Sequence, residues 1–355
     1  MRATMGFRQR RCFLRWLVAM TGGIGLHGCG GSGDAPSAGE DLAGPLATPV
    51  CANDDTDRSV VRYRLTDLGA LPGFPVSNGH ALSALGHAMS QATGDDGVRA
   101  FLAIRGTMRD LGTLGRGFSE KAFLYSDSVM RRNGEFDSRN SVGYALNSRA
   151  DVTGVAAFGP GLRHAFLVRS DGEAVDLGTL GGLQSAGYDV NDAGQIAGTS
   201  KIGETNAEHA FLYADGRMQD LGTLGGNASG GRAINVHGHV VGWADTDASR
   251  THAFLYSGGL MKDIDVFDGP ISEAHGINAA DWVVGLAVFP GYTAPHGFVH
   301  DGTSLRDLND LLIDGGRWEI TEALDINDAG QIVGSARIGS GAAAHAVLLT
   351  PPRAC

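Results

Sequence analysis

The sequence predicts an all-β fold, a β-propeller of four-stranded blades, and three observations carry this prediction. A motif of His, Ala or Gly, Phe or Val, and Leu or Val begins at positions 164, 209, 252, 296 and 345, with spacings of 43 to 49 residues. The composition is rich in turn residues, with 55 Gly and 11 Pro among 355 residues, while 43% of the residues are hydrophobic. The first and last repeat-like segments are complementary halves of one unit. Repetition at this spacing is typical of propeller blades.

Each repeat contains four short segments that read as strands. In the unit that begins at His209, one strand ends at the turn 214–216, and a second leads into the Gly-rich run 221–226. A hairpin follows, in which Asn235 and Gly238 lie three residues apart between apolar runs, as is typical of hairpin turns. Such hairpins occur at about 80–92, 142–156, 187–200, 231–244, 274–287 and 322–335.

Six hairpins predict six blades, and the chain ends predict how the ring closes. The segment 64–71 matches the second half of a unit and the segment 345–349 matches the first half, so the two ends complete one blade. Aligned on the interior units, Leu349 falls where Tyr213 does and Leu65 where Met218 does. Residues 116–140 begin a further unit, which leaves a seventh blade as an alternative. An open β-solenoid is the structural alternative, although it gives no reason for a split unit.

The N-terminus reads as an export signal over residues 1–28. Arg10 and Arg11 precede Cys-Phe-Leu-Arg, which resembles the twin-arginine export signal, and a plain Sec signal is the alternative. The apolar stretch ends in Leu-His-Gly before Cys29, which resembles a bacterial lipobox with Cys29 as the lipid-attachment residue. Cleavage by ordinary signal peptidase near Gly28 is the alternative. Residues 29–58 are then a flexible linker, and residues 59–355 form the propeller.

Two cysteines remain after export and acylation. Cys51 lies shortly before the first predicted strand, and Cys355 lies shortly after the last. Closure of the ring brings these positions together, so we expect a disulfide between them in an exported protein. Two unpaired cysteines in the tails are the alternative. The net charge of −11 makes nucleic acid an unsuitable partner, because phosphate binding needs a positive surface.

The repeat resembles a known family. The run His209-Ala210-Phe211, followed by Asp-Leu-Gly-Thr-Leu-Gly-Gly over 220–226 and by Ile-Asn-x-x-Gly-x-Val-Val-Gly over 234–242, is similar to the bacterial extracellular proteins named for their His-Ala-Phe (HAF) repeats. The resemblance covers about residues 62–350, and the unit at 110–140 departs from it. It implies an exported repeat protein with no established catalytic activity.

The repeated polar residues are interpreted as structural. One His per unit at the start of a strand is expected to bond to the neighbouring turn, and one Asp per unit, as in Asp220, is expected to hold N–H groups of the following turn. The sequence contains no His-Glu-x-x-His, Gly-x-Ser-x-Gly or Cys-x-x-Cys motif. We therefore predict no catalytic residues, no metal and no cofactor.

Single-copy aromatic residues point to a binding face. Two of the four connections in each unit are tight turns on one face, and the other two lie on the opposite face. Exposed aromatic side chains on variable loops are typical of protein or carbohydrate binding. The alternative is that each ring fills the space between its own two blades. The candidate residues are Phe74, Phe158, Phe267, Phe289, Tyr292 and Trp318.

These observations predict a monomeric, lipid-anchored scaffold for binding or adhesion that faces the periplasm or the cell surface, with a secreted protein as the alternative. Its ligand would be an envelope glycan or protein, and its only membrane contact the lipid anchor. The alternative function is a polysaccharide-active hydrolase or lyase. That reading requires single-copy charged residues on successive inner strands, for instance Asp189, Arg232, Glu273 and Glu322. A purely structural role in the envelope is the third hypothesis.

Overall fold

The computed structural model describes most of the chain after residue 60. The described ranges are 61–69, 76–82, 88–94, 97–104, 107–113, 123–126, 129–132, 141–203, 207–247, 250–265, 267, 269–313, 317–339 and 343–352. The predicted export signal with Arg10 and Arg11, the predicted lipid-attachment residue Cys29, and Cys51, Phe74 and Cys355 all lie outside these ranges.

The described chain is all-β apart from one short 3-10 helix, η1 (Leu308–Leu311). Its first strands form one four-stranded and one two-stranded sheet. They are β2 (Val76–Leu82), β3 (Ala88–Gly94), β4 (Gly97–Ile104), β5 (Thr107–Thr113), and then β6 (Phe123–Ser126) with β7 (Val129–Arg132). The next eight strands form two four-stranded units joined by one bridge between Arg163 and Gln184. They are β8 (Ser141–Leu146), β9 (Val152–Gly159), β10 (Leu162–Val168), β11 (Ala174–Asp176), β12 (Gly181–Val190), β13 (Ile196–Ile202), β14 (Glu208–Ala214) and β15 (Arg217–Asp220).

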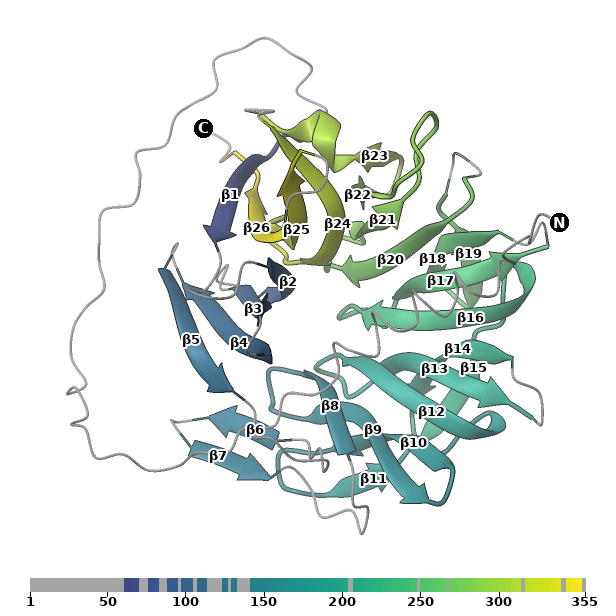
Figure 1. The fold of residues 1–355 in the computed structure, drawn as a ribbon. Coiled ribbons are helices and arrows are strands. Elements are labelled where there is room, and N and C mark those ends of the chain that lie inside the picture. Colours follow the sequence, from purple (N-terminus) through teal and green to yellow (C-terminus); the bar gives the residue numbers. More distant parts are fainter. Residues whose placement is uncertain are drawn as a thin grey trace, which may run out of the picture.

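Three further four-stranded sheets complete the described fold. Two consist of consecutive strands, and the third takes its fourth strand from the other end of the chain. They are β16 (Gly225–Ile234), β17 (Val240–Thr246), β18 (Thr251–Ser257), β19 (Leu260–Asp263); β20 (Ser272–Ile277), β21 (Val283–Ala287), β22 (His296–His300), β23 (Leu305–Asp307); and β24 (Trp318–Ile326), β25 (Ile332–Ile338), β26 (His345–Thr350), β1 (Arg64–Gly69). The sheets lie around a ring in a propeller-like arrangement, with β2, β8, β12, β16, β20 and β24 on the inside (Figure 1).

The chain ends pair as the sequence predicts. Strand β1 runs antiparallel to β26, with Leu65 opposite Leu349, which is the register of Met218 opposite Tyr213 in an interior sheet. This sheet also contacts the sheet β2–β5, because Ser77 Oγ accepts a hydrogen bond from the backbone N–H of Ala346 at 2.9 Å. The described neighbours therefore follow one another from β8 through β26 to β2.

The core consists of apolar layers between successive sheets. The Phe of the repeated motif is fully buried in four sheets, at Phe166, Phe211, Phe254 and Phe298. Phe254, for example, packs against Ala210 and Ile234, which joins the sheet β16–β19 to the sheet β12–β15. Burying one such ring stabilises the fold by roughly 2 to 3 kcal/mol. Val347 takes this position in the sheet that contains β26, and it is buried as well.

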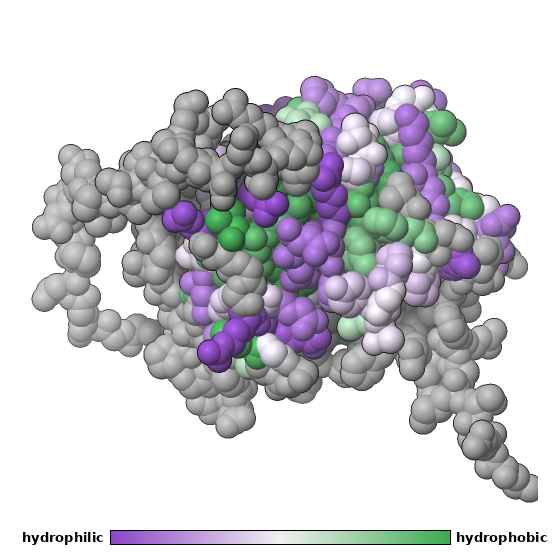
Figure 2. Space-filling model, turned by 90° about the horizontal axis from the view of Figure 1, so that it is seen from above, coloured by the Kyte–Doolittle hydropathy of each residue, from purple (hydrophilic) through white to green (hydrophobic). Residues whose placement is uncertain are grey.

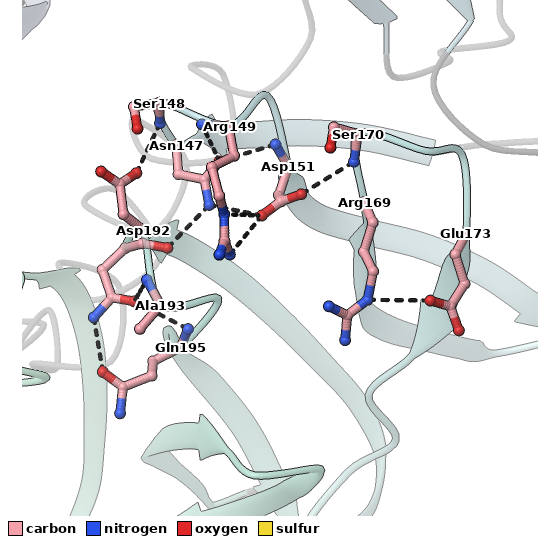
Figure 3. Close-up of polar contacts among 11 residues, drawn as sticks. Asn147, Ser148, Arg149, Asp151, Arg169, Ser170, Glu173, Asp192, Ala193 and Gln195 are labelled. Atoms are coloured by element: carbon pink, nitrogen blue, oxygen red, sulfur yellow. Dashed lines mark hydrogen bonds and ion pairs between the residues drawn. The ribbon is translucent and has the colours of Figure 1, made fainter.

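A ladder of asparagines joins the hairpin turns of neighbouring sheets. In each turn the Asn Oδ1 accepts bonds from the backbone N–H groups two and four residues later, as Asn191 does from Ala193 and Gln195 at 3.0 Å. The Nδ2 group then donates to the backbone oxygen of the next Asn along the ring, from Asn147 to Asn191 at 3.0 Å and from Asn191 to Asn235 at 2.9 Å. Figure 3 shows the turn of Asn147 beside the neighbouring turn with Asp192, Ala193 and Gln195. The ladder continues through Asn278 to Asn327. The five predicted hairpin turns that the structure describes, from 142–156 to 322–335, are confirmed, and they also hold the sheets to one another. The turn predicted within 80–92 lies outside the described residues.

Candidate functional site

The connections of the sheets divide between two faces. Because the strands of each sheet are antiparallel, the turn after the first strand and the turn after the third lie on one face, here called the turn face. The remaining connections lie on the opposite face, called the loop face. Around the sheet β20–β23 three loop-face connections are long, at 264–271, 288–295 and 308–317. Four of the predicted aromatic residues belong to these connections or follow them directly.

The loop face carries the repeated His–Asp pairs. The Nδ1 atom of the motif His lies 2.6 to 3.1 Å from a carboxylate oxygen of the Asp on the neighbouring strand. In four of the sheets the same Asp accepts a backbone N–H bond from two residues further along, as in Asp220 with Gly222 at 2.8 Å. The expected role of the Asp, which holds an N–H group of the following turn, is confirmed in these four sheets. The His differs from the expectation, because its Nδ1 pairs with this Asp and not with the turn itself. The pairs are His164–Asp176, His209–Asp220, His252–Asp263, His296–Asp307 and His345–Asp67.

Three of the predicted aromatic residues gather around one of these histidines. The centroid of the Tyr292 ring lies 4.3 Å from that of His296, and Phe289 lies 6.3 Å from His296 and 5.4 Å from Phe267. We call Phe267, Phe289, Tyr292 and His296 the aromatic patch. Tyr292 is 53% exposed and Phe267 is 40% exposed, whereas Phe289 is 7% exposed and contacts Phe267 and His296. Phe289 therefore fills the space within the fold, as the alternative reading proposed, and the other two rings face solvent.

An ion pair borders the aromatic patch. Arg337 donates to both carboxylate oxygens of Glu319, at 2.6 and 3.0 Å, and Glu319 also lies 3.8 Å from Nε2 of His296. The bond to Arg337 lowers the pKa of Glu319, so this carboxylate stays ionised at neutral pH. His296 itself is buried and held by Asp307 at 2.6 Å. The patch thus combines exposed rings with charged groups in fixed positions.

Two other predicted rings, Phe158 and Trp318, lie elsewhere on the loop face, and Phe74 lies outside the described residues. Phe158, which is 36% exposed, stacks on His164 at 5.3 Å, three sheets away from the patch along the chain. Trp318 is half-buried and meets His345 edge-on at 5.6 Å. Each therefore contacts the motif His nearest to it, His164 for Phe158 and His345 for Trp318. Hydrophobic and hydrophilic residues are interspersed on the described part of the side that Figure 2 shows.

A second group of polar residues lies on the inner strands. The guanidinium of Arg232 on β16 lies 5.0 Å from the ring centroid of Tyr188 on β12. On β20, His275 Nε2 lies 3.8 Å from Glu273, and Nδ1 lies 3.3 Å from Glu322 on β24. Tyr144 on β8 contacts Tyr188 at 5.2 Å. We call these six residues the inner cluster: Tyr144, Tyr188, Arg232, Glu273, His275 and Glu322.

Burial and charge act in opposite directions on the inner cluster. Burial lowers the pKa of His275, but Glu273 and Glu322 raise it by more, so it lies above the usual value. Burial raises the pKa of Glu273, but His275 and Arg232 lower it by more, so the pKa lies below its usual value and this carboxylate is ionised at neutral pH. Burial raises the pKa of Glu322. The inner cluster thus holds carboxylates of unequal acidity on either side of one imidazole.

Three of the four residues named for a polysaccharide-active enzyme meet in the inner cluster. Asp189 does not, because its carboxylate accepts backbone N–H bonds from Val190 and Ile234, each at 2.8 Å. The sequence reasoning missed Tyr144, Tyr188 and His275. A signal was present, since each stands three residues before a turn Asn, as Arg232 does. Among the described residues, no group of three or more His, Cys, Asp or Glu side chains is placed to hold a metal ion.

Comparison with known protein families gives a match over part of the chain, to a family whose function is unknown. The family model that matches, over residues 172–344, is described as "Protein of unknown function (DUF3466)". The identification of the chain with the HAF-repeat family is therefore wrong. The recurrence of the His–Asp pairs in the sheets does not depend on that name. No curated protein matches the chain.

Solved structures resemble the chain at low identity. One is TolB from Acinetobacter baumannii, with 12% identity, a TM-score of 0.39, and coverage of 79% of this chain and 65% of that chain. The present chain thus spans less than two thirds of that TolB chain. Another is a mutant of AofleA from Arthrobotrys oligospora, with 9% identity, a TM-score of 0.36, and coverage of 83% and 94%. In the part of the chain that the structure describes, no helix is both long and apolar enough to cross a membrane.

Proposed function

We propose that this protein is an exported binding scaffold, anchored by a lipid on Cys29, whose aromatic patch contacts an envelope glycan. The fold behind this proposal is a closed propeller, in which six four-stranded blades and the β6–β7 sheet complete one ring. The pairing of β1 with β26 and the bond from Ala346 to Ser77 support closure. A protein surface is the other ligand class that exposed rings suit.

One observation carries the proposal: two exposed rings, each in contact with a buried ring, lie beside charged groups. The Tyr292 ring lies against His296, whose orientation is fixed by the 2.6 Å contact with Asp307. A ring that is already ordered loses little conformational entropy on binding. An aromatic face packs against the C–H groups of a sugar ring, while ionised groups such as Glu319 and Arg337 bond to its hydroxyl groups. This combination favours a glycan over an apolar ligand.

The test is binding of the full-length protein to a glycan array and to envelope fractions. The double variant Phe267→Ala with Tyr292→Ala removes both exposed rings while Phe289 stays in place. The matched control is Leu260→Ala, which truncates a 59% exposed side chain on the turn face. We expect at least a tenfold loss of affinity in the double variant and none in the control. Equal binding by all three proteins would reject the aromatic patch as the site.

Export and anchoring are tested separately. Labelling cells with a radioactive fatty acid should mark the wild-type protein but not Cys29→Ser, and Arg10→Lys with Arg11→Lys should stop export by the twin-arginine route. The disulfide between Cys51 and Cys355 should appear as one cross-linked peptide under non-reducing conditions. Its proposal is supported by Arg64 pairing with Thr350, which brings the ends of the described chain together.

A further inference from the structure

Four residues of the inner cluster, all but Glu273 and Glu322, occupy a position that the fold leaves free to vary. On five inner strands one bulge residue interrupts the pairing with the second strand, three residues before the turn Asn. The bulge residues are Tyr144, Tyr188, Arg232, His275 and Leu324. The Asn that follows is the same in all five sheets because every ladder contact needs it. A position filled by four different kinds of side chain has no such common structural task, so its chemistry is open to a function.

The guanidinium of Arg232 has hydrogen-bond donors that no described group uses. Its guanidinium is half-buried and lies over the Tyr188 ring, which fixes its plane. Among the described groups none accepts a hydrogen bond from it, and the carboxylates nearest to it act on it only through longer-range attraction. A guanidinium has five N–H donors in a planar fork that matches a carboxylate. The free edge of Arg232 therefore suits a ligand carboxylate.

The neighbouring side chains call for hydroxyl groups on the same ligand. Glu273 and Glu322 share the single imidazole of His275, and each carboxylate has more acceptor positions than that ring can fill. A second carboxylate without hydroxyl donors would be repelled there. Tyr144, which is 38% exposed, adds an apolar ring face at the edge of the cluster. A hexuronate residue carries all three complements: a carboxylate, adjacent hydroxyl groups and a C–H face.

We propose that the inner cluster binds one hexuronate residue of an acidic polysaccharide, with its carboxylate on Arg232 and its hydroxyl groups on Glu273 and Glu322. This site is separate from the aromatic patch and does not depend on it. An uncharged hexose leaves Arg232 unpaired, and a simple carboxylate leaves the two glutamates without donors. Comparing the affinities for a uronate, an uncharged hexose and a simple carboxylate therefore distinguishes the proposed ligand class from the other two.

The test is titration of the full-length protein with glucuronate and with galacturonate, with binding measured by calorimetry or by ligand-observed NMR. Glucose, galactose and acetate are the comparison ligands. We expect a uronate to bind at least tenfold more tightly than each of these three. Arg232→Gln should weaken uronate binding at least tenfold, and Arg232→Lys should not restore it, because lysine keeps the charge but loses the planar fork.

Two further variants keep the result interpretable. Tyr144→Ala truncates an exposed ring and should weaken binding several-fold even if Arg232→Gln does not fold. Tyr292→Ala alters the aromatic patch and should leave uronate affinity unchanged. The proposal is overturned if neither uronate binds, if glucose or acetate binds as well as a uronate, or if folded Arg232→Gln binds as the wild type does. Loss of uronate binding in Tyr292→Ala would place the ligand on the loop face and would also overturn it.

Discussion

Replacing Asn235 by Ala tests whether the asparagine ladder holds neighbouring sheets together. The side chain is 4% exposed and makes four hydrogen bonds. Its Oδ1 accepts from His237 at 3.0 Å and His239 at 3.1 Å, and its Nδ2 donates to the Asn278 backbone oxygen at 3.1 Å and to Asp281 at 2.7 Å. A net hydrogen bond contributes about 1 kcal/mol, and water replaces part of the loss at the exposed turn, so we expect a cost of about 3 kcal/mol.

The assay is urea unfolding of the full-length protein, monitored by tryptophan fluorescence. Val236→Ala is the matched control, because Val236 lies in the same turn, is 58% exposed, and should cost less than about 0.5 kcal/mol. Asn235→Asp separates the two halves of the side chain: it keeps the acceptor, loses the donor, and places a carboxylate beside Asp281. We expect that variant to be less stable at pH 7 than at pH 5. A loss below about 1 kcal/mol in Asn235→Ala, or an equal loss in Val236→Ala, would refute the argument.

Three further predictions concern single positions. Gly242→Ala should prevent stable folding or lower the unfolding midpoint sharply, since an added Cβ would overlap the backbone oxygen of Gly230; circular dichroism melting checks this. Burial lowers the pKa of His252, but Asp263 raises it by more, so the pKa is higher in the folded protein than in the unfolded chain. The stability that this pair contributes is therefore present below the unfolded pKa and is lost as pH rises through the raised pKa. In urea unfolding, the free energy of unfolding should change less between pH 6 and 8 in His252→Asn than in the wild type. Burial raises the pKa of Asp189 to about 6, so its ionisation opposes folding, and stability falls as pH rises from about 4 to 6. From pH 4.5 to pH 7 the free energy of unfolding should fall in the wild type by on the order of 2 kcal/mol more than in Asp189→Asn. An equal fall in the two proteins would contradict this.

The sequence predicts the pairing within each sheet well because the same order of segments recurs in every repeat, including the two half units at the ends of the chain. Alignment of the half units placed Leu65 opposite Leu349, and the spacing of Asn and Gly placed the hairpin turns. Contacts between sheets are less visible, because they join residues about 44 positions apart whose side chains are equivalent in every unit. The bond from Asn191 to the Asn235 backbone is an example. Nothing in one repeat shows that the turn Asn has a second partner.

The candidate sites were predicted less completely, for two physical reasons. Phe267, Phe289 and Tyr292 were recognised as single-copy aromatics, yet only packing decides that Phe289 is buried while the other two are exposed. The inner cluster depends on a bulge, which inserts one residue and changes where the next side chains point. Alternation along a regular strand gives no hint of this. Arg232 could be suspected from its charge, whereas Tyr144 could be found only by comparing equivalent positions of the repeat.

The two proposed sites follow the same rule of construction. Positions that the fold needs are repeated, such as the Phe of the core and the Asn of the ladder, and positions that vary are free for function. His296 belongs to both groups, because it forms the repeated pair with Asp307 and also supports Tyr292. The structural pair therefore fixes the orientation of a ring that exists in only one unit. The loop residues of one sheet can then vary while the contacts that stabilise the other sheets stay as they are.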